Sequence, residues 1–211
     1  MAEATEMVPN FPGIAVKFDT AKNPFFRPIV EEALKKISSC ATGKLLLEKI
    51  GKAKPKSRAD FGVGVNVTVV PQPVSFVQAG HKQTWAASGG MDKTLVASAD
   101  SRHSPKDCPF YLLGGSQNAA KDPTASGNKD GSVCTMYFTN VQVITSKGEA
   151  TQPFIVLAHE LIHSYHCVTG IRLDGPNEEL WTTGIGAYAT EAISENAIRG
   201  ELGLPLRAEY F

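Results

Sequence analysis

The stretch Pro153-Phe-Ile-Val-Leu-Ala-His159-Glu160-Leu-Ile-His163-Ser-Tyr-His166 decides the fold and the chemistry of this chain. It contains the pattern H-E-x-x-H. Four residues are slightly more than one helical turn, so His159 and His163 project from the same face of a helix. Two such imidazoles can reach one zinc ion, with Glu160 beside the bound water as general base. The pattern therefore predicts a zinc-dependent peptidase.

The residues around this pattern indicate a buried helix. Pro153 suits the first turn of a helix, and Gly170 is suited to end it. The alternative is a buried helix whose histidines only make hydrogen bonds, and the presence of Glu160 favours the metal site over it. Apolar residues surround both histidines: Phe154, Ile155, Val156, Leu157, Ala158, Leu161 and Ile162.

A catalytic zinc ion needs a third protein ligand and keeps its fourth position for water. The pattern H-E-x-x-H-x-x-G-x-x-H is excluded, because His166 stands where glycine is required and Thr169 where the third histidine is required. A glutamate from a following helix is the other arrangement. Four candidates follow in the sequence: Glu178, Glu179, Glu191 and Glu195.

Two segments resemble the zinc site of the clostridial neurotoxin light chains. The segment His159–Ile171 is similar to their active-site helix, which reads H-E-L-I-H-x-x-H followed by a short stretch to G-I. The segment Glu178–Gly184 is similar to their E-E-L-x-T-x-G, in which the second glutamate is the third zinc ligand. The resemblance implies that Glu179 is this ligand.

A third match to the light chains lies near the end of the sequence. They place a supporting glutamate twelve residues before the arginine of an R-x-x-Y pair, and Glu195 precedes Arg207 by the same interval, with Tyr210 completing the pair. The resemblance implies that Arg207 and Tyr210 donate hydrogen bonds to the oxyanion of the tetrahedral intermediate. It also implies that Glu195 orients a metal ligand or holds Arg207.

One alternative third ligand remains open. The run Glu191-Ala-Ile-Ser-Glu195 resembles the E-x-x-x-D of thermolysin-type peptidases, where the glutamate binds zinc and the acid one turn later orients a histidine. Glu191 is therefore the alternative to Glu179.

The segment Ile193–Tyr210 resembles the C-terminal part of the NleD-like type III secreted effectors, which include the XopG group, and the likeness covers roughly residues 150–211. It implies one zinc ion per chain, type III secretion by a bacterium, and action in the host cell cytoplasm. The implied substrate is a host signalling protein, with the activation loop of a mitogen-activated protein kinase as candidate. The alternative is a non-catalytic protein on a zincin scaffold that binds and inhibits host proteins.

Composition limits the remaining possibilities. The chain has 211 residues, 42% of them hydrophobic, and a formal net charge of zero. This length suits one domain, and the charge balance argues against nucleic acid or a membrane as partner. We expect a monomer with a flexible N-terminal segment over residues 1–24, a candidate secretion signal, and a single zincin-like catalytic domain over residues 25–211.

Hydrophobic spacing places further elements along the chain. It predicts helices over 28–39 and 44–50, the second ended by Gly51, and strands over 63–70, 74–77, 94–98 and 133–145. The polar stretch 100–132 is expected to form a long loop that lines the cleft. Together these elements predict an α+β, compact zincin-like metallopeptidase fold, in which a twisted mixed sheet packs on the H-E-x-x-H helix beside a helical C-terminal lobe.

Overall fold

The computed structural model of the chain describes residues 3–55, 64–71, 131, 133–138, 143–144, 150–173 and 176–209. Strands and helices are both present, and the α+β class is confirmed. No helix among the described residues is long and apolar enough to cross a membrane.

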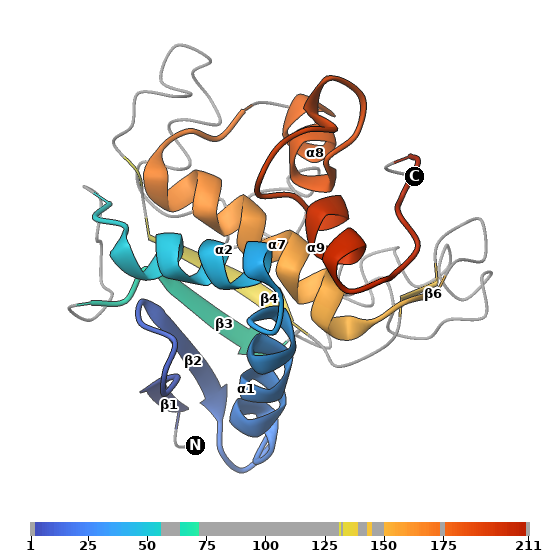
Figure 1. Ribbon diagram of the computed structural model, residues 1–211. Helices are drawn as coiled ribbons and strands as arrows, with labels where there is room; N and C mark the ends of the chain where they lie inside the picture. Colours follow the sequence, from blue (N-terminus) through green and yellow to red (C-terminus); the bar gives the residue numbers. More distant parts are fainter. Residues whose placement is uncertain are drawn as a thin grey trace.

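The main sheet has four strands in the order β1-β2-β3-β4 (Figure 1). β1 pairs antiparallel with β2, while β2, β3 and β4 run parallel to one another, so the sheet is mixed. β5 and β6 form a separate antiparallel pair just before the H-E-x-x-H helix. The strands span Glu3–Met7 (β1), Ile14–Asp19 (β2), Val67–Pro71 (β3), Cys134–Phe138 (β4), Val143–Ile144 (β5) and Ala150–Thr151 (β6).

The helices form two groups. α1, α2 and α7 lie over the sheet, and α8 and α9 pack on the side of α7 away from the strands (Figure 1). α7 is therefore enclosed between the sheet and the C-terminal helices. The helices span Phe26–Ile37 (α1), Ala41–Lys52 (α2), Pro153–Thr169 (α7), Pro176–Thr183 (α8), the 3₁₀ turn Gly186–Tyr188 (η2) and Glu195–Glu201 (α9).

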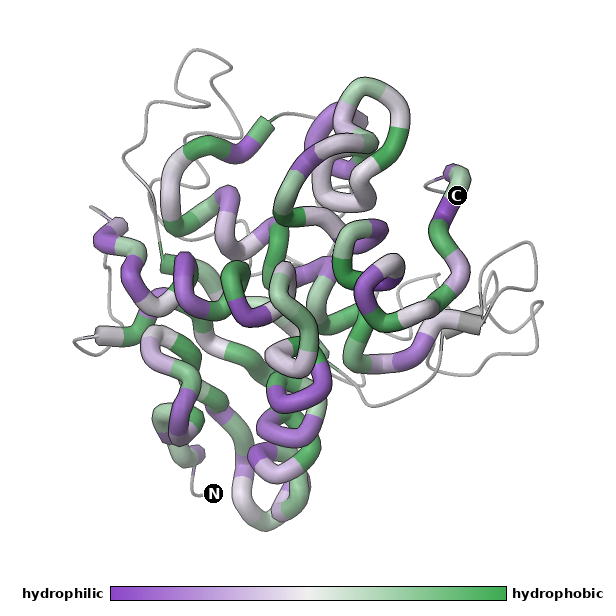
Figure 2. Tube along the Cα trace, in the orientation of Figure 1, coloured by the Kyte–Doolittle hydropathy of each residue, from purple (hydrophilic) through white to green (hydrophobic). Residues whose placement is uncertain are grey.

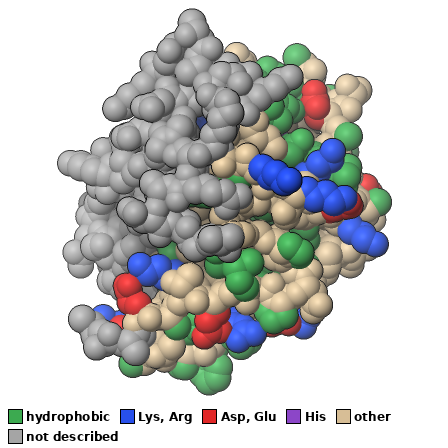
Figure 3. All heavy atoms as spheres, turned by 90° about the vertical axis from the view of Figure 1, so that its left-hand side faces the viewer, with side chains coloured by type: hydrophobic (Ala, Val, Ile, Leu, Met, Phe, Trp, Pro, Cys, Tyr) green, Lys and Arg blue, Asp and Glu red, His purple; other side chains and the backbone are tan. Residues whose placement is uncertain are grey.

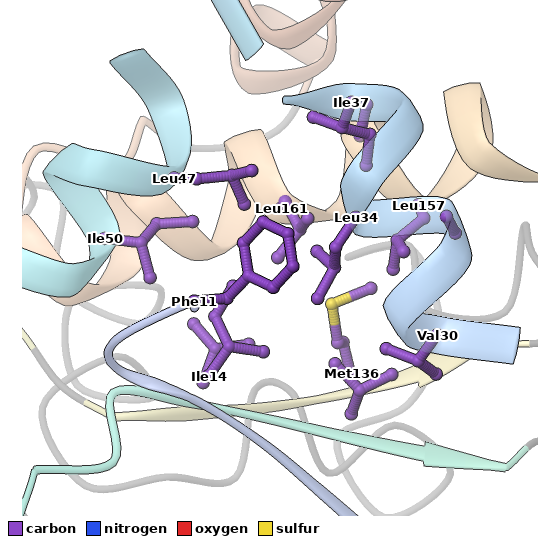
Figure 4. Close-up of a cluster of buried hydrophobic side chains, with 14 of the residues drawn as sticks. Phe11, Ile14, Val30, Leu34, Ile37, Leu47, Ile50, Met136, Leu157 and Leu161 are labelled. Carbon is purple, nitrogen blue, oxygen red and sulfur yellow. The ribbon is translucent and has the colours of Figure 1, made fainter. Parts of the chain in front are cut away.

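The core lies between the sheet and the first group of helices. Hydrophobic and hydrophilic residues alternate around α1, as expected of a helix with one buried face (Figure 2). Figure 4 shows how the buried side chains meet above the strands, where Leu34 of α1, Leu47 of α2 and Leu161 of α7 approach Ile14 and Met136 of the sheet. This packing fixes α7, and with it the histidines on its other face.

A carboxylate from the end of the chain ties the two groups together. Glu201 of α9 accepts hydrogen bonds from the backbone N–H of Thr42 at 3.0 and 3.2 Å and from its hydroxyl group. Thr42 stands in the first turn of α2, where the N–H groups have no partner within the helix. Glu201 therefore supplies part of the cap of α2 from a position 159 residues away in the sequence.

Charged side chains on the described surface pair with charges of opposite sign. Lys17 and Glu3 approach to 3.0 Å across β2 and β1, and Lys35 and Glu31 to 3.0 Å along α1. Figure 3 shows basic and acidic side chains intermixed on the described part of one face. Exposed pairs of this kind contribute little to stability, typically about 0–1 kcal/mol each.

Several sequence expectations are confirmed in the described part of the chain. α1 and α2 overlap the helices expected at 28–39 and 44–50, and β3 and β4 overlap the strands expected at 63–70 and 133–145. Gly51 does not end α2, which continues to Lys52, because one glycine at the last turn costs only about 1 kcal/mol. The strands expected at 74–77 and 94–98, and all of the 100–132 loop except residue 131, lie outside the described residues.

The N-terminal expectation differs most from the structure. Residues 3–19 belong to the segment 1–24 that we expected to be flexible, yet they form β1 and β2. β2 buries Ile14, Ala15, Val16 and Phe18, and it pairs in parallel with β3, whose residues lie some fifty positions later. The sheet of the domain therefore begins well before residue 25.

Candidate metal centre

Helix α7, which carries the H-E-x-x-H pattern, has the ends that the sequence predicts. Pro153 occupies the first helical position after Gln152. Gly170 follows the helix in the left-handed conformation at a φ of 68°. Its N–H donates to the carbonyl of Cys167 at 3.1 Å, and the N–H of Ile171 donates to the carbonyl of His166 at 3.0 Å. Glycine adopts this φ without the strain that a Cβ atom brings. Between these two ends, α7 directs the side chains of His159 and His163 toward α8 and α9.

Three side-chain atoms meet in a small triangle between α7 and α8. The Nε2 atoms of His159 and His163 are 3.1 Å apart. Oε2 of Glu179 lies 3.4 Å from the first and 3.3 Å from the second. His159, His163 and Glu179 are all buried, and they are the group in the described chain that could hold a metal ion.

The triangle fits zinc in both donor type and size. Zinc prefers imidazole nitrogen and carboxylate oxygen at about 2.0–2.2 Å, and a tetrahedral arrangement then separates neighbouring donors by about 3.4 Å. The three measured separations of 3.1, 3.3 and 3.4 Å agree with this spacing. Three donors also leave the fourth position that a catalytic site requires.

Glu178 supports His163 from behind. Its Oε1 lies 2.8 Å from Nδ1 of His163 and 2.9 Å from Nδ1 of His166, and its Oε2 accepts the N–H of Leu173 at 3.0 Å. The Thr182 hydroxyl is 3.1 Å from the same Nδ1 of His163. A carboxylate behind the ring fixes the tautomer in which Nε2 is free to bind metal.

Glu195 supports His159 in the same way from α9. Its Oε2 lies 2.8 Å from Nδ1 of His159 and 3.1 Å from Nη1 of Arg207, and its Oε1 accepts Nε–H of Arg199 at 2.6 Å. Ser194 begins α9 as its N-cap and accepts the N–H of Ala197 at 3.1 Å. Glu195 therefore stands in the first turn of α9, where the helix dipole favours a negative charge.

The turn between α8 and α9 depends on Gly184. It has a φ of 78°, and a Cβ atom on it would lie 2.4 Å from the Ser194 hydroxyl oxygen. The carbonyl of Gly184 accepts the side chain of Asn196 at 3.3 Å. The side chain of Asn196 also forms two hydrogen bonds with the backbone of Arg207. It accepts the N–H and donates to the carbonyl, both at 2.8 Å. The segment that carries Arg207 is thus fixed to α9.

The charges in this cluster shift one another's pKa values. Burial lowers the pKa of His159, but the carboxylates of Glu179 and Glu195 outweigh it and raise this pKa to about 9. His163 behaves likewise, and its pKa lies well above the usual 6.5 because of Glu179 and Glu178. Burial raises the pKa of Glu195, but His159 and the two arginines lower it to about 2.

The carboxylates of Glu178 and Glu179 respond in the same direction. Burial raises the pKa of each, and their histidine neighbours more than offset this, so both pKa values lie well below 4.5. The metal-free site therefore holds ionised carboxylates around protonated histidines. Zinc binding to these histidines must release protons.

The remaining predicted residues occupy different positions. Glu160 is buried on α7 directly after His159, with 3% of its surface exposed. Glu191 is exposed between η2 and α9, outside the group of metal-binding atoms, so the structure does not bring this alternative ligand to the triangle. Tyr210 lies outside the described residues.

An aromatic stack lies beside the metal-binding triangle. The ring of His166 stacks on Trp181 of α8 at 3.9 Å between centroids and 19° between planes, and Trp181 in turn faces Tyr188 of η2 at 6.1 Å. His166 lies outside the group of side chains that could hold a metal ion, and it joins α7 to α8 through Glu178 and Trp181.

Sequence reasoning considered Glu178 only as a candidate third ligand and assigned no role to Thr182, Asn196 and Arg199. Glu178 was visible as the first acid of the E-E pair, and Arg199 as a basic residue one turn after Glu195 on the same helix. Thr182 was visible as the threonine of the E-E-L-x-T-x-G pattern. The amide of Asn196 gave no such signal, because its partners are set by tertiary packing.

The structure was compared with solved structures and the sequence with known proteins. A derivative of the Clostridium botulinum neurotoxin type D, described as a targeted secretion inhibitor, aligns with 12% identity and a TM-score of 0.41 over 82% of this chain and 40% of that one. The light chain of botulinum neurotoxin type G aligns with 12% identity and a TM-score of 0.42 over 93% of this chain and 59% of that one. The chain thus spans less than two thirds of either. The curated proteins contain no match.

The family comparison covers most of the chain. Residues 16–210 match the sequence model of Peptidase_M91, whose description is "Effector protein". The matched region contains the α7 histidines, both supporting glutamates and Arg207. The chain therefore belongs to the Peptidase_M91 family of effector proteins.

Proposed function

We propose that this chain is a zinc-dependent endopeptidase that acts as a bacterial effector on a host protein. The observation that carries the proposal is the buried triangle of His159, His163 and Glu179, which has the donor types and spacing of a zinc site, with Glu160 adjacent on α7. A purely structural zinc site needs no general base and no open position. Membership of an effector peptidase family supports the same reading.

A zinc ion held by His159, His163 and Glu179 would act as a Lewis acid and lower the pKa of a bound water molecule toward about 7. Glu160 accepts the proton of this attacking water and delivers it to the leaving amine. Glu178 and Glu195 keep His163 and His159 oriented throughout, since each carboxylate accepts the Nδ1–H of one ring. Glu179 is the third ligand in this proposal, in preference to Glu191.

Arg207 is proposed to stabilise the oxyanion of the tetrahedral intermediate. Its guanidinium is anchored through Nη1 to Glu195, the carboxylate that also holds His159, so it lies beside the metal-binding group. An arginine carries five N–H donors in a planar fork, a geometry that suits an oxyanion. Tyr210, three residues later, is proposed as the second donor.

The proposed route is type III secretion by a bacterium and action in the host cell cytoplasm. The proposed substrate is a host signalling protein, with the activation loop of a mitogen-activated protein kinase as candidate. This part rests on the resemblance of the C-terminal segment to NleD-like effectors.

The test pairs the wild-type protein with Glu160→Gln. Zinc content is measured for both, and each is incubated with candidate host kinases before fragments are identified by mass spectrometry. We expect one zinc per chain in both and cleavage by the wild type alone. Zinc in both with no cleavage of any host protein would favour the non-catalytic alternative, and a wild type without zinc would overturn the proposal.

A further inference from the structure

Arg199 joins three separate segments of the molecule through one side chain. Its Nε donates to Glu195 at 2.6 Å, its Nη1 to the carbonyl of Pro205 at 3.1 Å, and its Nη2 to the hydroxyl of Thr151 at 3.1 Å. The side chain is buried, with 7% of its surface exposed. A buried guanidinium with every branch occupied is costly to assemble, so its contacts constrain the geometry around it.

The first contact gives the two carboxylate oxygens of Glu195 different partners. Arg199 holds Oε1, while Oε2 is shared by Nδ1 of His159 and Nη1 of Arg207. Without a partner on Oε1, the carboxylate is free to rotate and present either oxygen to His159. Arg199 therefore fixes the orientation of the group that orients the metal-binding ring.

The second contact fixes the tail that carries Arg207. The carbonyl of Pro205 accepts a hydrogen bond from the side chain of Arg199. The N–H of Leu204 donates to the backbone carbonyl of Arg199 at 2.8 Å. Asn196 then holds Arg207 itself. Residues 204–207 have no helix or strand hydrogen bonds, so these contacts determine where Arg207 lies.

The third contact joins Arg199 to the residues just before the N-terminus of α7. Thr151 ends β6 and is separated from Pro153, the first residue of α7, by Gln152 alone. Its hydroxyl, held by Nη2 of Arg199, links the start of the metal-binding helix to α9. One side chain thus couples the helix that carries His159, the carboxylate behind it, and the tail that carries Arg207.

We propose that Arg199 is a positioning residue of the peptidase site, which sets Glu195 behind the metal ligand His159 and sets the 204–207 segment so that Arg207 faces the substrate. The inference rests on the proposed function. It assigns to Arg199 no contact with metal or substrate. A lysine has one nitrogen in place of a planar fork, so it can keep the contact with Glu195 but not all three at once.

The experiment compares the full-length wild type with Arg199→Met, Arg199→Lys and the control Arg27→Met. Arg27 pairs with Glu6 at 2.7 Å on α1 and β1, away from the site, so its loss removes an arginine ion pair without touching Glu195. Zinc affinity is measured by competition with a chromogenic chelator. The visible absorption of the cobalt(II) form reports ligand geometry, and hydrogen exchange reports protection of the amides of Leu204 and Arg207.

We expect Arg199→Met to weaken zinc binding roughly tenfold, to shift the cobalt spectrum, and to speed exchange at residues 204–207. Arg199→Lys should bind zinc close to the wild-type affinity yet lose the protection of the tail, because its single nitrogen serves Glu195. Arg27→Met should match the wild type in all three measurements.

The inference is overturned if Arg199→Met keeps the wild-type zinc affinity and cobalt spectrum and only melts earlier. If Arg199→Met does not fold, Arg199→Lys decides, since an unchanged tail exchange in that variant would also overturn it. Failure of the proposed function gives a different result, in which the wild type itself binds no zinc or binds zinc without cleaving any host protein.

Discussion

The two histidines of the metal centre are supported by carboxylates in different surroundings. Glu178, behind His163, is fully buried and contacts imidazoles, a hydroxyl and a backbone N–H, and the guanidinium of Arg172 lies farther away at 4.0 Å. Glu195, behind His159, is flanked by the guanidinium groups of Arg199 and Arg207. The contacts of Glu178 stay within α7, α8 and residues 172–173 between them, whereas those of Glu195 continue into the tail. Glu178 therefore supports only a proposed metal ligand, and Glu195 also connects such a ligand to the segment proposed to face substrate.

The largest effect that separates the two sides is expected for Glu178→Ala. This change leaves Nδ1 of His163, Nδ1 of His166 and the N–H of Leu173 without their carboxylate partner in a buried place. Removing one member of such a buried network costs about 3–5 kcal/mol. Urea unfolding of the metal-free protein should show this loss. A loss below about 1 kcal/mol in the free energy of unfolding would mean that the hydrogen bonds of Glu178 do not stabilise the site.

Arg207→Ala should lower the turnover rate while leaving the zinc affinity nearly unchanged. Glu195 keeps His159 and Arg199 as partners after this change, so zinc affinity should stay within a few fold. Loss of one oxyanion donor typically lowers kcat by roughly 100- to 1000-fold. Rates are measured on the substrate identified by fragment analysis. Equal losses of zinc and turnover would show that Arg207 acts through the metal centre alone.

Proton release on metal binding gives a further comparison of the two sides. In the metal-free protein the pKa of His159 is raised to about 9, so at neutral pH this ring carries a proton that zinc must displace. Zinc affinity should therefore rise with pH through the neutral range, by about tenfold per unit for each displaced proton.

Two variants sharpen this test. Glu195→Gln removes one of the groups that raise the pKa of His159, and Glu178→Gln does the same for His163, so each should move the pH dependence toward lower pH. Competition with a chelator of known protonation constants measures the effect. An affinity that does not change between about pH 6 and 8 would contradict the protonated state of the metal-free site.

The smallest effect is expected for the hydroxyl of Thr182. It lies 3.1 Å from Nδ1 of His163, and Thr182→Val should cost about 0.5–1.5 kcal/mol in thermal unfolding. The next residue supplies a matched control. The Thr183 hydroxyl is buried and has no hydrogen-bond partner among the described residues, so Thr183→Val should be neutral or stabilising. Equal destabilisation by both changes would remove Thr182 from the supporting network.

The part of the structure that sequence predicts well is the part with local signals. Pro153 and Gly170 set the ends of α7 through backbone preferences that operate within a few residues, and both ends are as expected. The spacing of His159 and His163 follows from helical geometry alone. The motif that contains Glu179 was recognisable because it travels with the other two motifs of the neurotoxin-like pattern.

What sequence does not predict depends on contacts between distant segments. Residues 3–19 were expected to be flexible because this part of the sequence is polar and contains prolines. They form strands because the short apolar run of β2 pairs with β1 and, in parallel, with the distant strand β3. Arg199 offers one i,i+4 contact that helix geometry predicts. Its other two partners, Pro205 and Thr151, come together only after α9, β6 and the tail have packed.

The cap of α2 by Glu201 bears on when the chain can fold during synthesis. α2 lies near the beginning of the polypeptide, but its first turn receives this carboxylate only after residue 201 has left the ribosome. Helices of about a dozen residues are marginal in isolation, so α2 lacks one of its stabilising contacts until α9 has been made. A nascent chain halted before α9 would lack both Glu201 and Glu195, so the carboxylate that caps α2 and the one behind His159 are supplied by the same late helix.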